Sequence, residues 1–150
     1  MTGAVDWETY QAALKPLLGY CRYVDEGDVE AFVDIYTLDC VQDEGPISAR
    51  GHDEMRARVT AVIARYRATS HHLSNISMEW REDGTIAAMS SVYAWHRPIE
   101  GDDLEVWGRY IDVLRHERGA WRIAQSKLQV AGLRGMDRNP FAPVPRAVSG

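Results

Sequence analysis

Apolar residues in the first quarter of the chain recur at intervals of three and four positions, the spacing that places side chains on one face of an α-helix. The stripe comprises Trp7, Tyr10, Ala13, Leu14, Leu17, Leu18, Cys21 and Val24. Pro16 lies within it, so this proline either interrupts the helix or begins a second one. The turn signal Glu26-Gly27-Asp28 ends the stripe. The pattern therefore predicts helical structure from about residue 7 to the turn.

Two shorter helices are predicted before residue 67, with a strand between them. The first runs from about Val29 to Tyr36, and its buried side chains would be Phe32, Val33 and Tyr36. Residues 38–42 form a short candidate strand, which ends at Asp43-Glu44-Gly45-Pro46. The other helix follows Arg50-Gly51-His52-Asp53, and its buried face would carry Met55, Val59, Val62, Ile63 and Tyr66.

The second half of the chain changes to an alternating pattern that indicates β-strands. Four strands are predicted, over residues 69–80, 85–97, 104–116 and 120–131. Asp83-Gly84 is a hairpin signal between the first two, and turn signals separate the others. Helices followed by consecutive strands are typical of an α+β fold. We expect three N-terminal helices packed on a strongly curved, mainly antiparallel sheet, which forms a cone with a blind pocket.

Length and composition favour one soluble domain, with residues 1–132 as the domain and residues 133–150 as a proline-containing tail that is loose or wraps the surface. Of the 150 residues, 45% are hydrophobic and 26% are charged, an ordinary globular balance. The net charge of −5 argues against binding to nucleic acid or to an anionic membrane surface. The chain has no apolar run of spanning length and no recognisable signal peptide, so we expect a cytoplasmic protein.

Metal and cofactor motifs are absent from the sequence. Cys21 and Cys40 are isolated and are expected to be small core residues. The histidines have no metal-ligand spacing, and the glycine motifs of nucleotide-binding proteins are missing. The sequence therefore predicts neither a metal nor a cofactor.

An acid and a histidine pair are the candidate chemical groups. Asp25 ends the first helix, where it is either a solvent-facing turn acid or a carboxylate at the pocket mouth that orients an imidazole. His71 and His72 begin the first long strand, and successive strand residues point to opposite faces. Only one of them can therefore face the pocket, and the periodicity does not choose between them. Tyr20, about 140° around the helix axis from Asp25, is either a core tyrosine or a substrate-facing hydroxyl.

Four segments, taken in order, resemble the SnoaL-like branch of the NTF2-like superfamily. They are residues 20–28, residues 36–41, residues 69–75, and residues 108–112 with 119–123. Within that branch the chain is most similar to scytalone dehydratases, bile-acid dehydratases and hexachlorocyclohexane dehydrochlorinases. These lyases place an aspartate at the end of the first helix and a histidine on the first long strand. The resemblance thus selects Asp25 and His71 as the catalytic pair.

The same resemblance assigns further roles and shows departures. Tyr20 matches the helix tyrosine of the bile-acid enzymes. Val24 and Asp43 stand where the scytalone enzymes have tyrosines, and their second catalytic histidine has no clear match, because the corresponding region holds Gly108 and Arg109. Scytalone itself is therefore not the expected substrate.

The resemblance implies a cofactor-independent lyase for a small to medium, hydrophobic, ring-containing molecule. His71 would abstract a proton, Asp25 would hold the imidazole, and Tyr20 would donate a hydrogen bond to the substrate. The expected pocket walls are Tyr36, Asn75, Trp95, Trp107 and Arg109. The alternatives are an isomerase or polyketide-type cyclase, and a non-catalytic ligand-binding or structural subunit. Long curved sheets and five tryptophans favour a homodimer or homotrimer.

Overall fold

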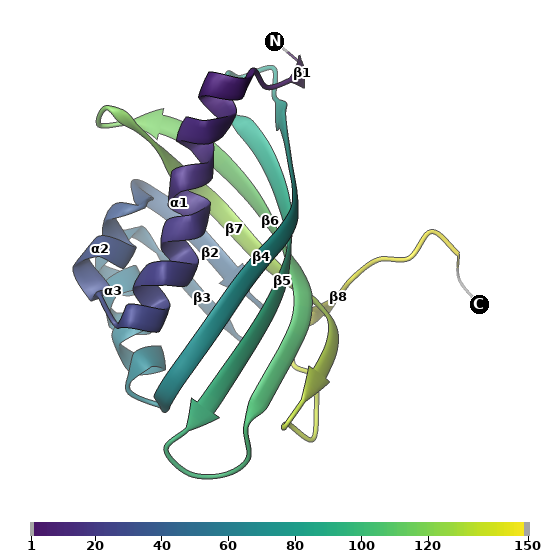
Figure 1. Cartoon of the computed structure of the whole chain (residues 1–150). Helices are drawn as coiled ribbons and strands as arrows, with labels where there is room; N and C mark the ends of the chain where they lie inside the picture. Colours follow the sequence, from purple (N-terminus) through teal and green to yellow (C-terminus); the bar gives the residue numbers. More distant parts are fainter. Residues whose placement is uncertain (1, 149–150) are drawn as a thin grey trace.

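The computed structural model describes residues 2–148, in which three helices pack against one side of a strongly curved, eight-stranded sheet (Figure 1). The helices are α1 (Trp7–Glu26), α2 (Val29–Asp34) and α3 (Gly51–Ile63). The strand order is β1 (Gly3–Ala4), β4 (Tyr66–Trp80), β5 (Ile86–Pro98), β6 (Leu104–Glu117), β7 (Ala120–Arg134), β2 (Tyr36–Glu44) and β3 (Ile47–Arg50), and β8 (Ala142–Pro143) pairs with β7. The predicted α+β cone is confirmed.

Antiparallel pairing joins β4 through β7, as the alternating pattern predicts. Strands β2 and β8 each run parallel to β7, so the sheet is mixed. Its curvature is accompanied by register shifts, one in β4 between Ser74 and Ser77 and one between β6 and β7 at Trp107 and Gly108. Such bulges bend a strand and increase its local twist, and the curved sheet leaves room beneath the helices.

Helix α1 is continuous through Pro16 and is capped at both ends. At its start, the Asp6 side chain accepts a hydrogen bond from Thr9 N at 3.0 Å. At its end, Gly27 adopts the left-handed conformation with a φ of 73°, which glycine reaches without steric cost. The stop at Gly27 places Asp25 in the last helical turn, beside the sheet.

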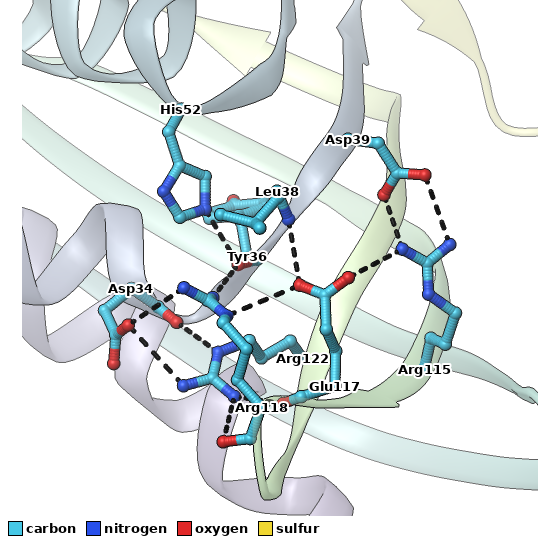
Figure 2. A network of polar contacts seen from close by, with 9 residues as sticks. All are labelled: Asp34, Tyr36, Leu38, Asp39, His52, Arg115, Glu117, Arg118 and Arg122. Atoms are coloured by element: carbon cyan, nitrogen blue, oxygen red, sulfur yellow. Dashed lines mark hydrogen bonds and ion pairs between the residues drawn. The ribbon is translucent and has the colours of Figure 1, made fainter.

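A polar network fixes the beginning of β2 against the β6–β7 hairpin (Figure 2). The Arg122 side chain, 11% exposed, donates to the main-chain oxygens of Asp34 at 2.8 Å, Glu117 and Arg118. Glu117 accepts from Leu38 N at 2.9 Å. The bond to Leu38 N satisfies a backbone group in the irregular stretch of the β2–β7 ladder between Tyr36 and Val41. The bonds of Arg122 join the end of α2 to the β6–β7 turn.

The structure differs from the sequence prediction at three places, and the network explains the first. Tyr36 begins β2 and does not end the second helix, because its carbonyl oxygen is bonded by Arg118 at 3.0 Å and lies 3.0 Å from His52 Nε2. Tyr66 likewise begins β4 and is not part of the third helix. Strand β3, which the sequence did not predict, pairs with the end of β2. A partner distant in sequence, Arg118, therefore helps to decide where β2 begins.

The C-terminal segment returns to the sheet after β7. Ala142 and Pro143 pair with Gln129 and Val130 of that strand, and Phe141 packs against the core. Gly45, with a φ of 72°, allows this approach, since a Cβ atom there would lie 3.0 Å from Pro140 O.

Both cysteines, Cys21 and Cys40, are buried and have free thiols. In residues 2–148, no helix has both the length and the apolar character required to cross a bilayer.

Candidate functional site

A cavity of about 110 Å³ lies between the helices and the inner face of the sheet. Its walls are mainly apolar and include Val24, Phe32, Val59, Val92, Ala94, Val106 and Leu128. Its polar lining includes Tyr20, Glu44, Arg58, His71, His96 and Tyr110. Ile47, Val62 and Arg65 line both the cavity and a neighbouring surface depression, so the mouth lies between β3 and the end of α3.

Asp25 and His71 are in direct contact at the wall of this cavity. Oδ1 of Asp25 lies 2.7 Å from Nδ1 of His71, and Oδ2 accepts a hydrogen bond from the His71 main-chain N–H at 2.9 Å. Thr69 Oγ1 donates to Oδ1 at 2.7 Å. The His71 side chain is only 6% exposed, and that of Asp25 is 24% exposed. Three groups, namely the His71 ring, the His71 main chain and Thr69, thus hold the carboxylate, and it fixes the ring in one orientation.

The environment favours the ionised form of Asp25. Burial alone would raise the pKa of its carboxyl group, but the hydrogen bonds from the His71 ring, the His71 main chain and Thr69 hold that pKa below its ordinary value. A carboxylate can only accept hydrogen bonds, so Nδ1 of His71 carries the proton that faces it. Nε2 is then the ring nitrogen available to a molecule in the cavity.

His96, which sequence reasoning missed, is a second histidine at this site. Its ring meets that of His71 edge-on, with centroids 5.1 Å apart. Burial, and then the neighbouring His71, lower the pKa of His96 from 6.5 to about 4, against the opposing effect of Asp25. His96 is therefore neutral near pH 7. His96 lies on β5, next to the strand that carries Gly108 and Arg109. The alternation of inward and outward side chains along β5 could have identified His96 from the sequence, because it shares the inward face with Val92 and Ala94.

The cavity has a polar floor that the sequence analysis also missed. Tyr110 Oη donates to Tyr20 Oη at 3.1 Å, and Tyr20 Oη donates to Glu44 Oε1 at 3.3 Å. Glu44 forms an ion pair with Arg58, and both side chains are at most 10% exposed. Gln42 Nε2 donates to Glu44 Oε1 at 2.9 Å.

The floor carries a stable ion pair. Burial is the largest single influence and opposes the charge of Arg58, but Glu44 together with Tyr20, Tyr36 and Tyr110 outweighs it and raises the pKa of the guanidinium above its ordinary value. Burial chiefly raises the pKa of the Tyr20 hydroxyl, which stays protonated. Arg58 could have been noticed as a charge between the apolar positions Met55 and Val59 of α3.

Three predicted wall residues face away from the cavity, and their placement is corrected here. Trp95, Trp107 and Arg109 are odd-numbered residues of β5 and β6, whereas the even-numbered residues of both strands point inward. Trp95 Nε1 donates to Asp103 at 3.1 Å, and Arg109 Nε donates to Gln129 at 2.7 Å. Both bonds lie on the outer face.

The two remaining predicted wall residues are also absent from the cavity lining that the structure describes. Tyr36 is fully buried beside Phe32. Asn75 occupies the β4 bulge with a φ of 50° and donates to Ser91 Oγ at 3.3 Å. His72 contacts the ring of Tyr93 on the outer face, with centroids 5.9 Å apart. His71, Tyr20 and Asp25 are thus the predicted residues that the fold brings together.

No cluster suited to a metal ion occurs in the described part of the chain, counting groups of three or more His, Cys, Asp or Glu side chains. The lining instead offers acid/base groups, hydroxyls and apolar surface.

Comparison with known structures gives close matches in fold. A Novosphingobium aromaticivorans protein provisionally assigned as a scytalone dehydratase is 24% identical, over 94% of this chain and 96% of its own, with a TM-score of 0.86. A protein from the same organism, provisionally assigned as an aromatic ring hydroxylase, is 25% identical over 88% and 96%, with a TM-score of 0.83. A hexachlorocyclohexane dehydrochlorinase is 15% identical over 94% and 97%, with a TM-score of 0.77.

The sequence comparisons identify the family. No curated protein matches the chain. The family model described as the SnoaL-like domain matches residues 6–127, which is most of the chain and includes Tyr20, Asp25, His71 and His96. This protein therefore belongs to the SnoaL-like domain family.

Proposed function

We propose that this protein is a lyase that catalyses an elimination reaction, with His71 as the general base. The observation that carries the proposal is the Asp25–His71 contact of 2.7 Å at the wall of an open, mainly apolar cavity. An imidazole that is oriented by a carboxylate and faces a ligand space is suited to general acid/base catalysis near neutral pH. The fold shared with a dehydrochlorinase and with a protein assigned as a dehydratase supports this class of reaction.

The proposed step is a proton transfer followed by loss of a group. Nε2 of His71 takes a proton from a carbon next to a carbonyl group. The C–H electron pair becomes the new carbon–carbon double bond, and the bond to the β-hydroxyl breaks. The protonated imidazole returns its proton to the departing oxygen, so water leaves and His71 is neutral again. No external oxidant, reductant or co-reactant enters this balance.

Asp25 is assigned to orientation and charge compensation. Its carboxylate fixes the proton on Nδ1, and it stabilises the imidazolium that exists between the two proton transfers, as the carboxylate does in a catalytic triad. Thr69 and the His71 main-chain N–H hold the carboxylate in place. The ring therefore needs little reorganisation when the charge develops.

His96 and Tyr20 are assigned as positioning residues. The neutral ring of His96 packs edge-on against His71 and limits its rotation. The Tyr20 hydroxyl donates to Glu44, so its proton is not available to a substrate oxygen. Tyr20 therefore organises the polar floor and does not act as the hydrogen-bond donor to the substrate that we expected.

A dehydration assay tests the proposal. The probe is β-hydroxycyclohexanone, and the appearance of cyclohexenone is followed by its ultraviolet absorbance. We expect the wild-type protein to accelerate this reaction and His71→Ala to abolish the acceleration. His72→Ala, on the outer face, is the matched control and should retain it. Exchange of the α-proton without loss of water would favour an isomerase or cyclase. Binding of the probe without any proton exchange would indicate a non-catalytic ligand-binding protein.

A further inference from the structure

The hydrogen bonds of the cavity floor have a direction that chemistry fixes. The carboxylate of Glu44, paired with Arg58, can only accept hydrogen bonds. Tyr20 must therefore donate its proton to Glu44, and its oxygen must accept the proton of Tyr110. The Tyr110 hydroxyl has then used its one proton. What Tyr110 offers to the cavity is a lone pair.

The charged groups around the cavity all have hydrogen-bonding partners. Glu44 forms an ion pair with Arg58, and the Asp25 carboxylate is hydrogen-bonded by the neutral ring and the main chain of His71. Arg65, at the mouth, is exposed to solvent. No described residue of the interior carries an uncompensated positive charge, so a charged carboxylate or phosphate brought inside would lose its hydration without gaining a counter-ion. The interior thus favours an uncharged ligand.

The enclosed space accommodates one ring. The cavity measures about 110 Å³. An engineered apolar cavity of roughly 150 Å³ binds benzene. A six-membered ring therefore fits with modest movement of the walls, whereas a fused ring system would require a much larger rearrangement to lie wholly inside.

We propose that the site takes an uncharged, single-ring alcohol and that Tyr110 determines this specificity by accepting a hydrogen bond from a ring hydroxyl. This proposal rests on the proposed function in placing the substrate ring between Tyr110 and His71. Arg58, Glu44 and Tyr20 act through Tyr110 as positioning residues, because together they fix the direction of its hydrogen bond. Chains of hydrogen bonds also polarise one another and strengthen the terminal acceptor.

Equilibrium binding of two probes tests this assignment. Cyclohexanol and cyclohexanone have similar size and no charge, but only the alcohol can donate a hydrogen bond. Titration by isothermal calorimetry should show that wild-type protein binds the alcohol about 5- to 10-fold more tightly, the range expected for one hydrogen bond. Tyr110→Phe keeps the ring and removes the acceptor, so the two affinities should become equal. Tyr93→Phe removes a hydroxyl on the outer face and should retain the preference.

A second variant tests the direction of the chain. Glu44→Gln combined with Arg58→Met leaves no unpaired charge and replaces the carboxylate with an amide that can donate. Tyr20 can then donate toward Tyr110, which frees the Tyr110 proton for a ligand oxygen, and the preference should shift toward cyclohexanone.

Three outcomes would overturn the proposal: equal affinities in the wild type, a preference that survives Tyr110→Phe, or no binding of either ring. Neither probe can undergo the proposed elimination. A preference for the alcohol without turnover of β-hydroxycyclohexanone would therefore reject the lyase assignment and leave this one standing.

Discussion

His71 is bonded to Asp25 twice, through Nδ1 of its ring and through its own main-chain N–H, at 2.7 and 2.9 Å. The second contact ties the carboxylate to the strand that carries the histidine. Asp25 belongs to α1 and His71 to β4, so one side chain joins the helical layer to the sheet at the cavity wall. The packing of α1 on β4 therefore sets the orientation of the His71 ring.

The first prediction concerns Asp25→Asn. The amide keeps the shape of the side chain but cannot stabilise the imidazolium or hold its proton on Nδ1 by charge. We expect turnover of β-hydroxycyclohexanone to fall by about 10²- to 10⁴-fold, with little change in KM. Steady-state kinetics measure this, and circular dichroism checks that the fold is retained. A folded variant with wild-type kcat would remove Asp25 from the mechanism.

The second prediction is a loss of stability in mild acid that depends on His96. Its pKa is about 4 in the folded protein and near the ordinary 6.5 when unfolded. Between these values the unfolded chain binds more protons, so the free energy of unfolding decreases as the pH falls from about 6.5 toward 4. His71 and Asp25 also face His96, and both are unchanged in the His96→Gln variant with which the wild type is compared.

Urea unfolding at about pH 7 and about pH 5 measures this dependence. His96→Gln cannot titrate in that range, so it should lose less stability between the two conditions than the wild type does. An identical loss in both proteins would show that His96 does not remain neutral in the folded state.

The third prediction concerns the network at the start of β2. Arg122→Met removes bonds to three main-chain oxygens (Figure 2) and should reduce the free energy of unfolding by about 2 to 4 kcal/mol. Arg134→Met is the matched control, because Arg134 is 75% exposed and its contacts, with Glu105 and with the face of the Trp107 ring, lie at the surface. Arg134→Met should reduce the free energy of unfolding by less than about 1 kcal/mol. Equal effects in chemical denaturation would contradict the structural role of Arg122.

The fourth prediction is self-association through the outer face of the sheet. Met89 and Trp107 are 40% and 37% exposed there, on neighbouring strands. We expect light scattering at micromolar concentration to give two or three times the chain mass of 16.9 kDa. Trp107→Lys should shift the protein toward the single chain, whereas Leu18→Lys, at an exposed position of α1, should not. A wild-type mass of 16.9 kDa would refute the prediction.

Periodicity and local turn signals predicted the helices and the four long strands. The family resemblance, and not the periodicity, selected the Asp25–His71 pair. Sequence reasoning failed for the cavity walls on β5. The large residues of that strand, Tyr93 and Trp95, point outward, and the inward positions include the small residues Ala88, Ser90 and Ala94. The inward side chains that line the cavity include Val92 and Ala94, which are small enough to leave space there. The expectation of aromatic walls therefore selected the wrong face.

The polar floor could not be predicted because its pairing is not local. Glu44 ends β2, and Arg58 lies 14 residues later on α3. Tyr20 and Tyr110 are 90 residues apart. The packing of α1 and α3 on the sheet brings these groups together. The periodic pattern of a single segment carries no information about contacts between segments.

The most direct test of the account is proton exchange at carbon. Cyclohexanone is incubated in D₂O with wild-type protein, and loss of the proton signal next to the carbonyl is followed by NMR. The account predicts that the wild type accelerates this exchange, that Asp25→Asn slows it strongly, and that His71→Ala returns it to the uncatalysed rate while His72→Ala does not. Equal exchange with the wild type and with folded His71→Ala would contradict the assignment of His71 as the base.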